Sequence, residues 1–242
     1  MKAVVCGANG AMGLLLQKSL GDRVAGLVSI DGENGVPKSF SQLGKTDADV
    51  VIDFSHHSAI ADVLTYAVEN RLAAVVATTG HTAEEIAQIT AAAEKIPVFF
   101  SGNMSLGIAV LCRIAKEAAA AFPDADIEIV EVHHNRKVDA PSGTAHMLFR
   151  ALRQVRPEAR SVCGRAGEGK RKKDQIGISS LRMGNVVGIH EIHICTPSQT
   201  LTLRHEAHDR AMFADGSVAA AEFVAGKPAG LYTMEHMLEE SK

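Results

Sequence analysis

Two imidazoles, an ammonium group and a predicted helix start lie together in the segment EVHHNRKVDAPSGTA, residues 131–145. His133 and His134 come at the end of a predicted strand, and Lys137 adds a positive charge shortly after them. Ser142 opens a predicted helix, whose first N–H groups and positive dipole end attract anions. The residue types and their spacing therefore predict a carboxylate site beside groups that can donate protons.

A glycine-rich turn, GANGAMG at residues 7–13, stands where a first predicted strand passes into a first helix. At such a junction, glycines let backbone N–H groups approach a pyrophosphate closely. The GxxGxxG spacing departs from the strict GxGxxG fingerprint, because Asn9 and Met12 occupy the places of its second and third glycines. A glycine turn that is needed only for close packing is the alternative interpretation.

Three further segments follow predicted strands and strengthen the dinucleotide interpretation. Asp31 comes 18 residues after Gly13, where an acidic side chain accepts hydrogen bonds from an adenosine ribose. TTG at residues 78–80 and SGN at residues 101–103 lie at the sheet edge where doubly wound folds bind ligands. Together they predict a nicotinamide cofactor. The carboxylate of Asp31 repels a 2′-phosphate, which favours NADH over NADPH, although Lys38 can offset that repulsion.

A hydride donor combined with these proton donors fits a reduction. Hydride delivered to a substrate leaves negative charge on it, and an imidazole, whose ordinary pKa is near neutrality, can supply the balancing proton. An ammonium group stabilises that charge in a closed, poorly hydrated cleft. A histidine pair at a strand end, or a lysine by itself, is more often structural or solvated. The catalytic interpretation rests on their occurrence together with a dinucleotide loop.

Length and composition narrow the class of protein. The chain has 242 residues, which corresponds to one large domain or two small ones. Its 46% hydrophobic and 22% charged residues are ordinary globular proportions and exclude wholesale disorder. A net charge of −3 gives no general attraction to nucleic acid or to an anionic membrane. Without a long apolar run or a signal peptide, we expect a cytoplasmic protein, and the wide spacing of its four cysteines predicts no metal site.

The first hundred residues alternate short apolar runs with helical stripes. The runs are rich in valine and too short for helices, as in buried parallel strands, and they lie at 2–6, 24–30, 50–54, 73–77 and 98–100. Ser55 is expected to cap the helix after the third run, and Thr82 with Glu85 predicts a capping box after the fourth. This alternation predicts an α/β fold with a doubly wound parallel sheet.

After about residue 125 the pattern changes, which predicts a second, smaller α+β domain with a mixed sheet. The predicted elements are a strand, a helix and an antiparallel hairpin, at 127–134, at 143–155, and at 184–195 with 201–208. The expected bounds are 1–104 for a dinucleotide-binding domain, completed by 210–242, and 105–209 for a substrate-binding domain.

The chain resembles the dihydrodipicolinate reductase family, also called 4-hydroxy-tetrahydrodipicolinate reductases. The family motif E-x-H-H-x-x-K-x-D-A-P-S-G-T-A is matched at every specified position from Glu131 to Ala145, and GxxGxMG is matched from Gly7 to Gly13. Residues 53–55 are similar to the family's D-F-[ST], and residues 183–188 to its R-x-G-x-[IV]-[VP]-G stretch. The resemblance implies NAD(P)H-dependent reduction of 4-hydroxy-tetrahydrodipicolinate, a small dicarboxylate, in lysine and diaminopimelate biosynthesis.

The resemblance also implies roles for individual residues. His133 would be the general acid, and Lys137 a second proton donor or charge stabiliser. The implied substrate contacts are His134, Ser142, Gly143 and Thr144. The implied cofactor contacts are Gly7, Ala8, Asn9, Gly10, Ala11, Met12, Asp31, Ala77, Thr78, Thr79, Ser101, Gly102, Asn103 and Met104. A homotetramer joined through the sheets of the substrate domain is implied as well.

The sequence departs from the family pattern at two places. The usual G-T-T-G begins here with Ala77, and His81 follows that turn where an aromatic residue is frequent. These differences concern the contacts with the nicotinamide ring. No arginine follows Asp31, unlike in relatives that accept NADPH well, which again favours NADH.

A basic loop and several histidines allow more than one interpretation. The segment 164–177 combines glycines with lysine and arginine, and we expect a lid that closes over a dianionic substrate, a plain solvated loop being the alternative. Four histidines near the predicted hairpin are interpreted as one face of a sheet rather than a metal site, namely His190, His193, His205 and His208.

Two other functions stay open at this point. Another dehydrogenase on the same frame, acting on an amino acid or a semialdehyde, would be expected to carry a catalytic cysteine after a strand, whereas Cys112 falls within a helical stripe. A dinucleotide sensor without enzymatic activity needs the glycine turn but has no use for His133 and Lys137 together.

Overall fold

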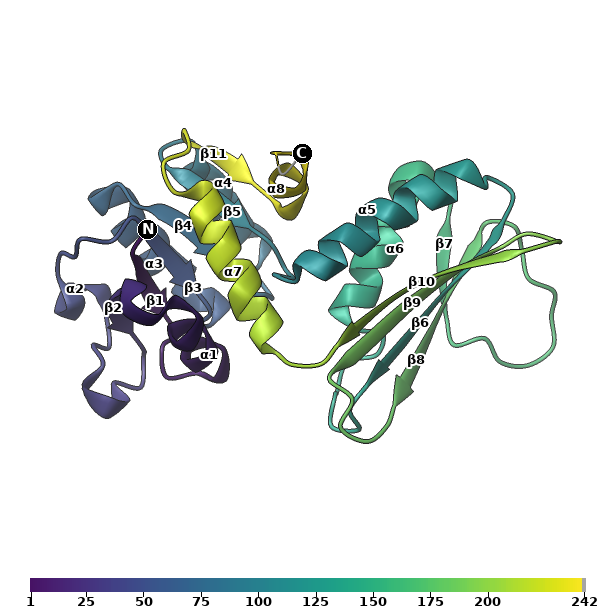
Figure 1. The fold of residues 1–242 in the computed structure, drawn as a ribbon, viewed down its shortest axis with the longest axis horizontal. Coiled ribbons are helices and arrows are strands. Elements are labelled where there is room, and N and C mark those ends of the chain that lie inside the picture. Colours follow the sequence, from purple (N-terminus) through teal and green to yellow (C-terminus); the bar gives the residue numbers. More distant parts are fainter. Residues whose placement is uncertain (241–242) are drawn as a thin grey trace. The chain divides into compact units, whose positions relative to one another are not determined.

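The computed structural model describes residues 1–240 and contains two compact units (Figure 1). The first comprises Met1–Ser105 and Arg210–Lys242, and the second comprises Leu106–Asp209. Residues 241 and 242, which the expected domain bounds include, lie outside the described residues. None of the helices in residues 1–240 combines the length and the apolar character that crossing a bilayer requires.

The first unit is built on a six-stranded parallel sheet in the order β11-β5-β4-β3-β1-β2. Its strands are β1 (Ala3–Cys6), β2 (Val24–Val28), β3 (Val50–Asp53), β4 (Ala73–Val76), β5 (Pro97–Phe100) and β11 (Gly230–Tyr232). Its helices are α1 (Ala11–Leu20), α2 (Phe40–Leu43), α3 (Ile60–Asn70), α4 (Ala83–Ala93), α7 (Ala211–Val224) and α8 (Met234–Glu240). The doubly wound parallel sheet expected from the sequence is thereby confirmed.

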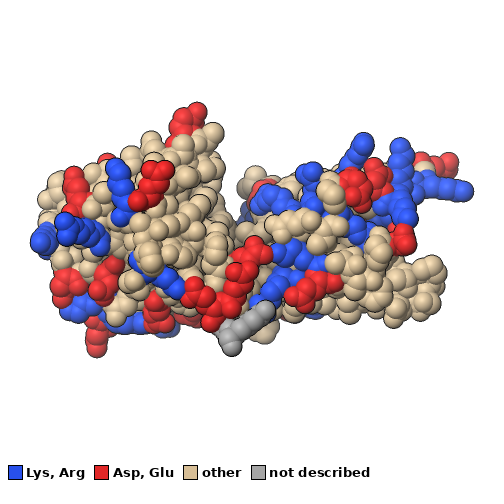
Figure 2. Space-filling view, turned by 90° about the horizontal axis from the view of Figure 1, so that it is seen from above, with Lys and Arg blue, Asp and Glu red and all other residues tan. Residues whose placement is uncertain are grey.

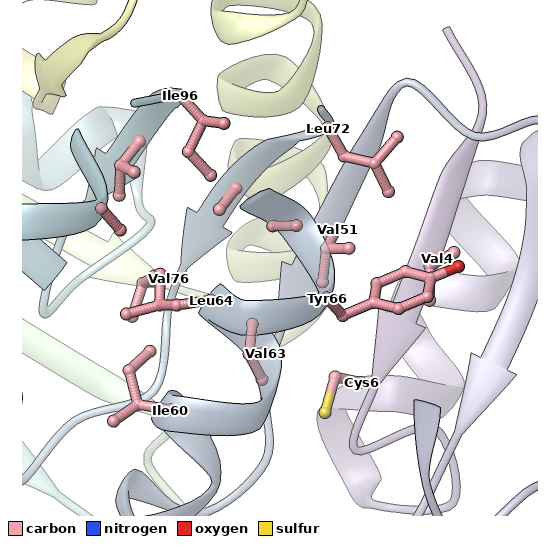
Figure 3. Packing of buried hydrophobic residues seen from close by; sticks show 14 of the residues in the cluster. Val4, Cys6, Val51, Ile60, Val63, Leu64, Tyr66, Leu72, Val76 and Ile96 are labelled. Carbon is pink, nitrogen blue, oxygen red and sulfur yellow. The ribbon is translucent and has the colours of Figure 1, made fainter. Parts of the chain in front are cut away.

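Helices cover both faces of this sheet, which explains why its strands appear in the sequence as continuous apolar runs. Helices α1 and α7 pack together on one face, and α3 and α4 lie against each other on the other (Figure 1). Ile60, Val63 and Leu64 of α3 meet Val51 and Val76 of the sheet (Figure 3). All five side chains are buried, so the carboxyl ends of the strands are held in fixed positions at one edge.

The two helix caps expected in this unit have different outcomes. The capping box of Thr82 and Glu85 is confirmed at the start of α4. The prediction that Ser55 caps a helix is wrong, because its N–H and Oγ both donate to Oδ1 of Asp53, at 3.0 and 2.5 Å. The chain then passes through a 3-10 turn capped by His56 before α3 begins at Ile60. The buried side chain of Asp53, two residues earlier, accepts from the hydroxyl and so withdraws it from the helix start.

The second unit holds a mixed five-stranded sheet in the order β10-β9-β6-β8-β7. Its elements are α5 (Leu106–Ala121), β6 (Asp126–His133), α6 (Gly143–Val155), β7 (Arg160–Cys163), β8 (Gln175–Arg182), β9 (Gly188–Cys195) and β10 (Thr200–Ala207). Helices α5 and α6 bury one face, where Ile127, Ile129 and Ile192 of the sheet meet Leu148 and Leu152 of α6. The expected second domain with a mixed sheet is confirmed, and its helix runs over the predicted residues 143–155.

The basic loop lies at the amino-terminal end of β6 and β8, and the expectation of a lid over the site of its own chain is wrong. In the parallel β6–β8 pair, Ile127 is opposite Ile176 and His133 is opposite Arg182. The loop precedes β8, so six residues of strand, about 20 Å, separate its end from His133. Arg171 anchors it there, with Nη1 2.6 Å from Asp126 Oδ1.

The positive charge of the second unit is therefore not evidence of a substrate lid. Figure 2 shows Lys and Arg side chains gathered on this unit, with Asp and Glu among them. In the basic loop the pairing is direct, because Lys173 Nζ lies 2.5 Å from Asp124 Oδ1. Because two of its cations, Arg171 and Lys173, already have acidic partners in the same unit, the loop is less suited to a dianionic ligand than its composition indicates.

Candidate active site

A buried carboxylate, Glu131 on β6, organises the cluster in the second unit. Its Oε2 accepts from Nδ1 of His133 at 2.5 Å, and the guanidinium of Arg182 donates to both of its oxygens, at 2.8 and 2.9 Å. The N–H of Ser142 donates to Oε1 at 3.1 Å. Burial raises the pKa of Glu131, but hydrogen bonds from His133, Arg182 and Ser180 outweigh it and hold that pKa well below its usual range. Glu131 is therefore an anion that binds both a histidine ring and the backbone before α6.

This arrangement determines which nitrogen of His133 faces a ligand. Because Nδ1 donates to Glu131, the ring orientation is fixed and Nε2 is the nitrogen that can donate a proton elsewhere. The geometry is that of a general acid supported by a buried anion.

Lys137 lies in the turn that follows β6, and an ion pair holds its ammonium group. Nζ of Lys137 is 2.6 Å from Oδ1 of Asp139. Burial raises the pKa of Asp139, but the hydrogen bond and charge of Lys137 lower it overall. The backbone N–H of Lys137 donates to the carbonyl of His134 at 3.1 Å, which closes the turn between the two residues. The side chain of Lys137 is 22% exposed, so its ammonium group is accessible to a ligand.

The start of α6 offers an anion site next to these groups in the sequence. Ser142 is the N-cap, and its Oγ accepts from the N–H of Ala145 at 3.2 Å. Gly143 is exposed, and a Cβ built there would meet no atom within 4 Å, so a ligand can approach this residue closely. With the hydroxyl of Ser142 occupied by the helix, the exposed amide of Gly143 and the adjoining Thr144 are the groups best placed for a carboxylate.

The glycine turn of the first unit has a geometry that only glycine permits at two of its positions. Gly7 has φ +81°, and a Cβ there would lie 2.4 Å from the carbonyl oxygen of Phe54. A Cβ at Gly13 would lie 2.2 Å from the carbonyl oxygen of Gly7. Gly10, the N-cap of α1, has no side chain and therefore cannot cap the N–H groups of the first helical turn. The turn fits a pyrophosphate.

Replacing Gly13 by alanine is expected to weaken NADH binding about 100-fold, because the added methyl group displaces the turn by the order of an ångström. The Kd is measured by fluorescence titration, together with the unfolding temperature. Gly21→Ala is the matched control. It strains a positive φ at the other end of α1, at a cost of roughly 1–3 kcal/mol, without touching the turn. Wild-type affinity in Gly13→Ala would contradict the assignment of the turn.

Asp31 lies three residues beyond β2, and Asn9 of the glycine turn holds its carboxylate. Nδ2 of Asn9 donates to Oδ1 of Asp31 at 2.5 Å, and the N–H of Glu33 donates to the same oxygen at 3.1 Å. The hydrogen bond from Asn9, followed by that from Glu33, lowers the pKa of Asp31. The departure from the glycine fingerprint at Asn9 thus has a structural purpose, because an amide at this place fixes an exposed acid next to the turn.

The two turns after β4 and β5 are held by internal hydrogen bonds. Thr78 is buried and its Oγ1 donates to the carbonyl of Asp53 at 3.4 Å, while Ala77 is buried beside it and Thr79 is exposed. Oγ of Ser101 donates to the carbonyl of Asn103 at 2.7 Å. Within these turns, the exposed positions available to a ligand are Thr79, Gly80 and Gly102, whereas Met104 is buried.

His81, where the family often has an aromatic residue, turns its side chain into the first unit. The side chain is 2% exposed, and the ring packs on Phe100 with centroids 5.8 Å apart. Its Nδ1 lies 3.5 Å from Oε2 of Glu85, the capping-box residue. The histidine therefore supports the turn from inside as an aromatic ring would.

The structure brings the predicted residues together in two sets, one in each unit. His133 and Ser142 share the carboxylate of Glu131, and Lys137 pairs with Asp139. Asn9 and Asp31 meet in the first unit, as described above. Sequence reasoning assigned no role to Glu131 or Arg182. The sequence did contain a signal for Glu131. Residues two apart on a strand point to the same face, and Glu131 stands two residues before His133.

Comparisons with known proteins identify the same family over both units of the chain. Family models described as dihydrodipicolinate reductase, N-terminus, and dihydrodipicolinate reductase, C-terminus, match residues 1–104 and 107–238. The 4-hydroxy-tetrahydrodipicolinate reductase of Caldanaerobacter subterraneus subsp. tengcongensis is 41% identical over 252 residues and is covered to 99%, as is this chain. That of Alkaliphilus oremlandii is 40% identical over 240 residues, with 98% of each chain covered.

A solved structure shares the fold. The dipicolinate-bound dihydrodipicolinate reductase from Paenisporosarcina sp. TG-14 superposes with a TM-score of 0.77 at 24% identity, covering 96% of this chain and 97% of that one. The likeness extends over both units, so the succession of a doubly wound unit and a mixed-sheet unit is common to the two proteins.

Proposed function

The chain belongs to the dihydrodipicolinate reductase family, and we propose that it reduces 4-hydroxy-tetrahydrodipicolinate to tetrahydrodipicolinate with NADH in lysine and diaminopimelate biosynthesis. It is an NAD(P)H-dependent oxidoreductase by that membership. The observation that carries the finer proposal is the pair of Glu131 and His133 next to the start of α6, because it joins a supported proton donor to an anion site.

The reaction can be written for the residues of this chain. One carboxylate of the substrate accepts hydrogen bonds from Gly143 and Thr144 at the positive end of α6, and His134 contacts the same ligand. A reduced nicotinamide supplies the hydride when it is bound. The hydroxyl group of the substrate leaves as water, which gives a conjugated ring. His133 donates a proton from Nε2 to balance the hydride that adds to this ring, and Glu131 holds the imidazole in place. The ammonium group of Lys137 stabilises negative charge on the substrate during the transfer.

The cofactor preference is proposed from Asp31. In this proposal its carboxylate accepts from the hydroxyls of an adenosine ribose and repels the 2′-phosphate of NADPH. The proposed cofactor contacts are otherwise the glycine turn and the exposed residues of the two turns after β4 and β5.

Replacement of Asp31 by alanine is expected to raise the KM for NADH at least about tenfold, because a hydrogen bond to a charged group is lost, and to lower the KM for NADPH. Initial rates with each cofactor measure the change. Asp22→Ala removes another exposed acid of the first unit and serves as control. An unchanged ratio of the two KM values in Asp31→Ala would show that preference is set elsewhere.

The assembly is proposed to be a homotetramer joined through the sheets of the second unit. Helices α5 and α6 cover only one face of this sheet. Val130, Val132 and Leu181 alternate with residues of the covered face, so they point to the other, and Leu181 is 42% exposed. A second copy would bury these apolar side chains. A cytoplasmic location, where reduced nicotinamide is made, is part of the same proposal.

One assay tests the proposed function. Purified protein is mixed with NADH and with the product freshly made from pyruvate and aspartate semialdehyde by the preceding synthase, and NADH absorbance is followed. Consumption that depends on this product is expected. NADH binding without consumption would identify a sensor, and oxidation of an amino acid or a semialdehyde with NAD⁺ in its place would identify another dehydrogenase.

A further inference from the structure

His190 on β9 is a buried histidine in the site to which the reaction assigns no task. It is 4% exposed and lies opposite Glu131 in the β6–β9 pair. Its ring meets the ring of His133 edge to face, with centroids 5.1 Å apart and planes at 74°. Nε2 of His190 is 3.2 Å from Oγ of Ser142. One side chain thus contacts both the proton donor and the cap of the helix that is proposed to bind substrate.

Gly188, two residues earlier on the same strand, leaves room for the catalytic ring. A Cβ at this position would lie 3.1 Å from Nε2 of His133 and 3.8 Å from Cε1 of His190. The distance of 3.1 Å is shorter than an ordinary contact, so any larger residue would press on the nitrogen that donates the proton. Gly188 and His190 of β9 therefore both limit the position of the His133 ring.

The charge state of His190 suits this place. Burial, followed by the positive charge of His133, lowers the pKa of His190 to about 4, while the charge of Glu131 acts in the opposite direction and His205 and Lys137 lower it further. A neutral ring supports a charged neighbour without repelling it. The hydroxyl of Ser142, which accepts from Ala145, can donate its own proton to Nε2 of a neutral His190.

We infer that His190 and Gly188 are positioning residues, which form a seat for the ring of His133 and connect it to the start of α6 through Ser142. The inference rests on the proposed function, in which His133 donates the proton and the start of α6 binds the substrate. The two contacts of His190 have different consequences. The ring edge fixes the orientation of His133 and affects kcat, whereas the contact with Ser142 fixes the start of α6 and affects the affinity for the dicarboxylate.

Two substitutions of His190 separate these contacts. His190→Gln keeps an acceptor for Ser142 and loses the ring, so kcat is expected to fall about tenfold with the Kd for dipicolinate, the probe, within about twofold of wild type. His190→Phe keeps the ring and loses the acceptor, so the Kd for dipicolinate is expected to rise about fivefold with kcat within about twofold. Gly188→Ala is expected to lower kcat in the same way as His190→Gln.

Calorimetric titration gives the Kd, steady-state rates give kcat, and thermal unfolding reports folding. His236→Gln is the matched control, because His236 is an exposed histidine on α8 and glutamine at this place can keep its contact with the N–H of Thr233. The ring of His133 is followed directly by NMR, its signal being assigned by its loss in His133→Gln. Its pH titration is expected to shift in His190→Gln and in Gly188→Ala, and to stay as in wild type in His236→Gln.

The outcomes distinguish the inference from the proposed function. If wild-type protein does not consume NADH, the proposed function fails, while the dipicolinate affinities and the NMR titrations still test the seat. If wild-type protein is active but His190→Gln and His190→Phe change the same quantity equally, or change stability alone, the inference is overturned.

Discussion

His133→Gln is expected to lose about 100- to 1000-fold in kcat while its Kd for dipicolinate stays within about threefold of wild type, since general acid catalysis contributes on that scale. Glutamine can donate a hydrogen bond toward Glu131, so the buried carboxylate keeps a partner. Its amide cannot be protonated at neutral pH, however, so no proton reaches the substrate from this position. The loss therefore falls on the chemical step and not on binding.

Steady-state rates with NADH and the freshly made substrate measure the effect, with dipicolinate titration for affinity. His236→Gln makes the same change at an exposed position of the first unit and is expected to leave both quantities unchanged. Wild-type turnover in His133→Gln would remove His133 from the mechanism. A large loss of affinity with little loss of kcat would make it a substrate contact instead.

Lys137→Ala is expected to reduce kcat and dipicolinate affinity by about tenfold each, and kcat/KM by about 100-fold, because its ammonium group interacts with the charged ligand before and during hydride transfer. Removing it also leaves the carboxylate of Asp139 without its 2.6 Å partner, next to an anionic substrate. Part of the lost affinity is therefore repulsion by Asp139.

A double variant, Lys137→Ala with Asp139→Asn, separates these two contributions. It is expected to recover some dipicolinate affinity and little of kcat. Lys172→Ala removes an exposed lysine of the basic loop, at the other end of the sheet, and is the control for net charge. If Lys172→Ala weakened dipicolinate binding as much as Lys137→Ala does, the effect would be one of overall charge and the assignment of Lys137 would fail.

The sequence predicts the fold in those segments where the apolar residues follow one clear pattern, either a short continuous run or a helical stripe. The buried strands of the first unit show continuous apolar runs and helix α6 shows a helical stripe, and the structure places them within a few residues of the predicted bounds. Strands β7 and β8 were missed. β8 carries Gly177 in its interior and two serines after Ile178, which obscures the alternation of a strand. The carboxylate of Glu128 lies over this glycine, a tertiary contact that no local pattern contains.

The candidate site was predictable for the residues that a motif holds close together, and not for those that neighbouring strands bring in. His133, Lys137 and the start of α6 stand within one segment. Arg182 and His190 come from β8 and β9, and their contacts with Glu131 and Ser142 depend on strand register. The lid interpretation failed for the same reason, because only the parallel register of β6 and β8 shows at which end of the sheet the basic loop lies.

A crystal structure of the protein with NADH and dipicolinate bound tests the central claim most directly. The account predicts one carboxylate of dipicolinate on the amides of Gly143 and Thr144, the ammonium group of Lys137 against the ligand, and Nε2 of His133 within hydrogen-bond distance of it. Dipicolinate bound away from the start of α6, or a His133 ring whose Nε2 points away from the ligand, would contradict it.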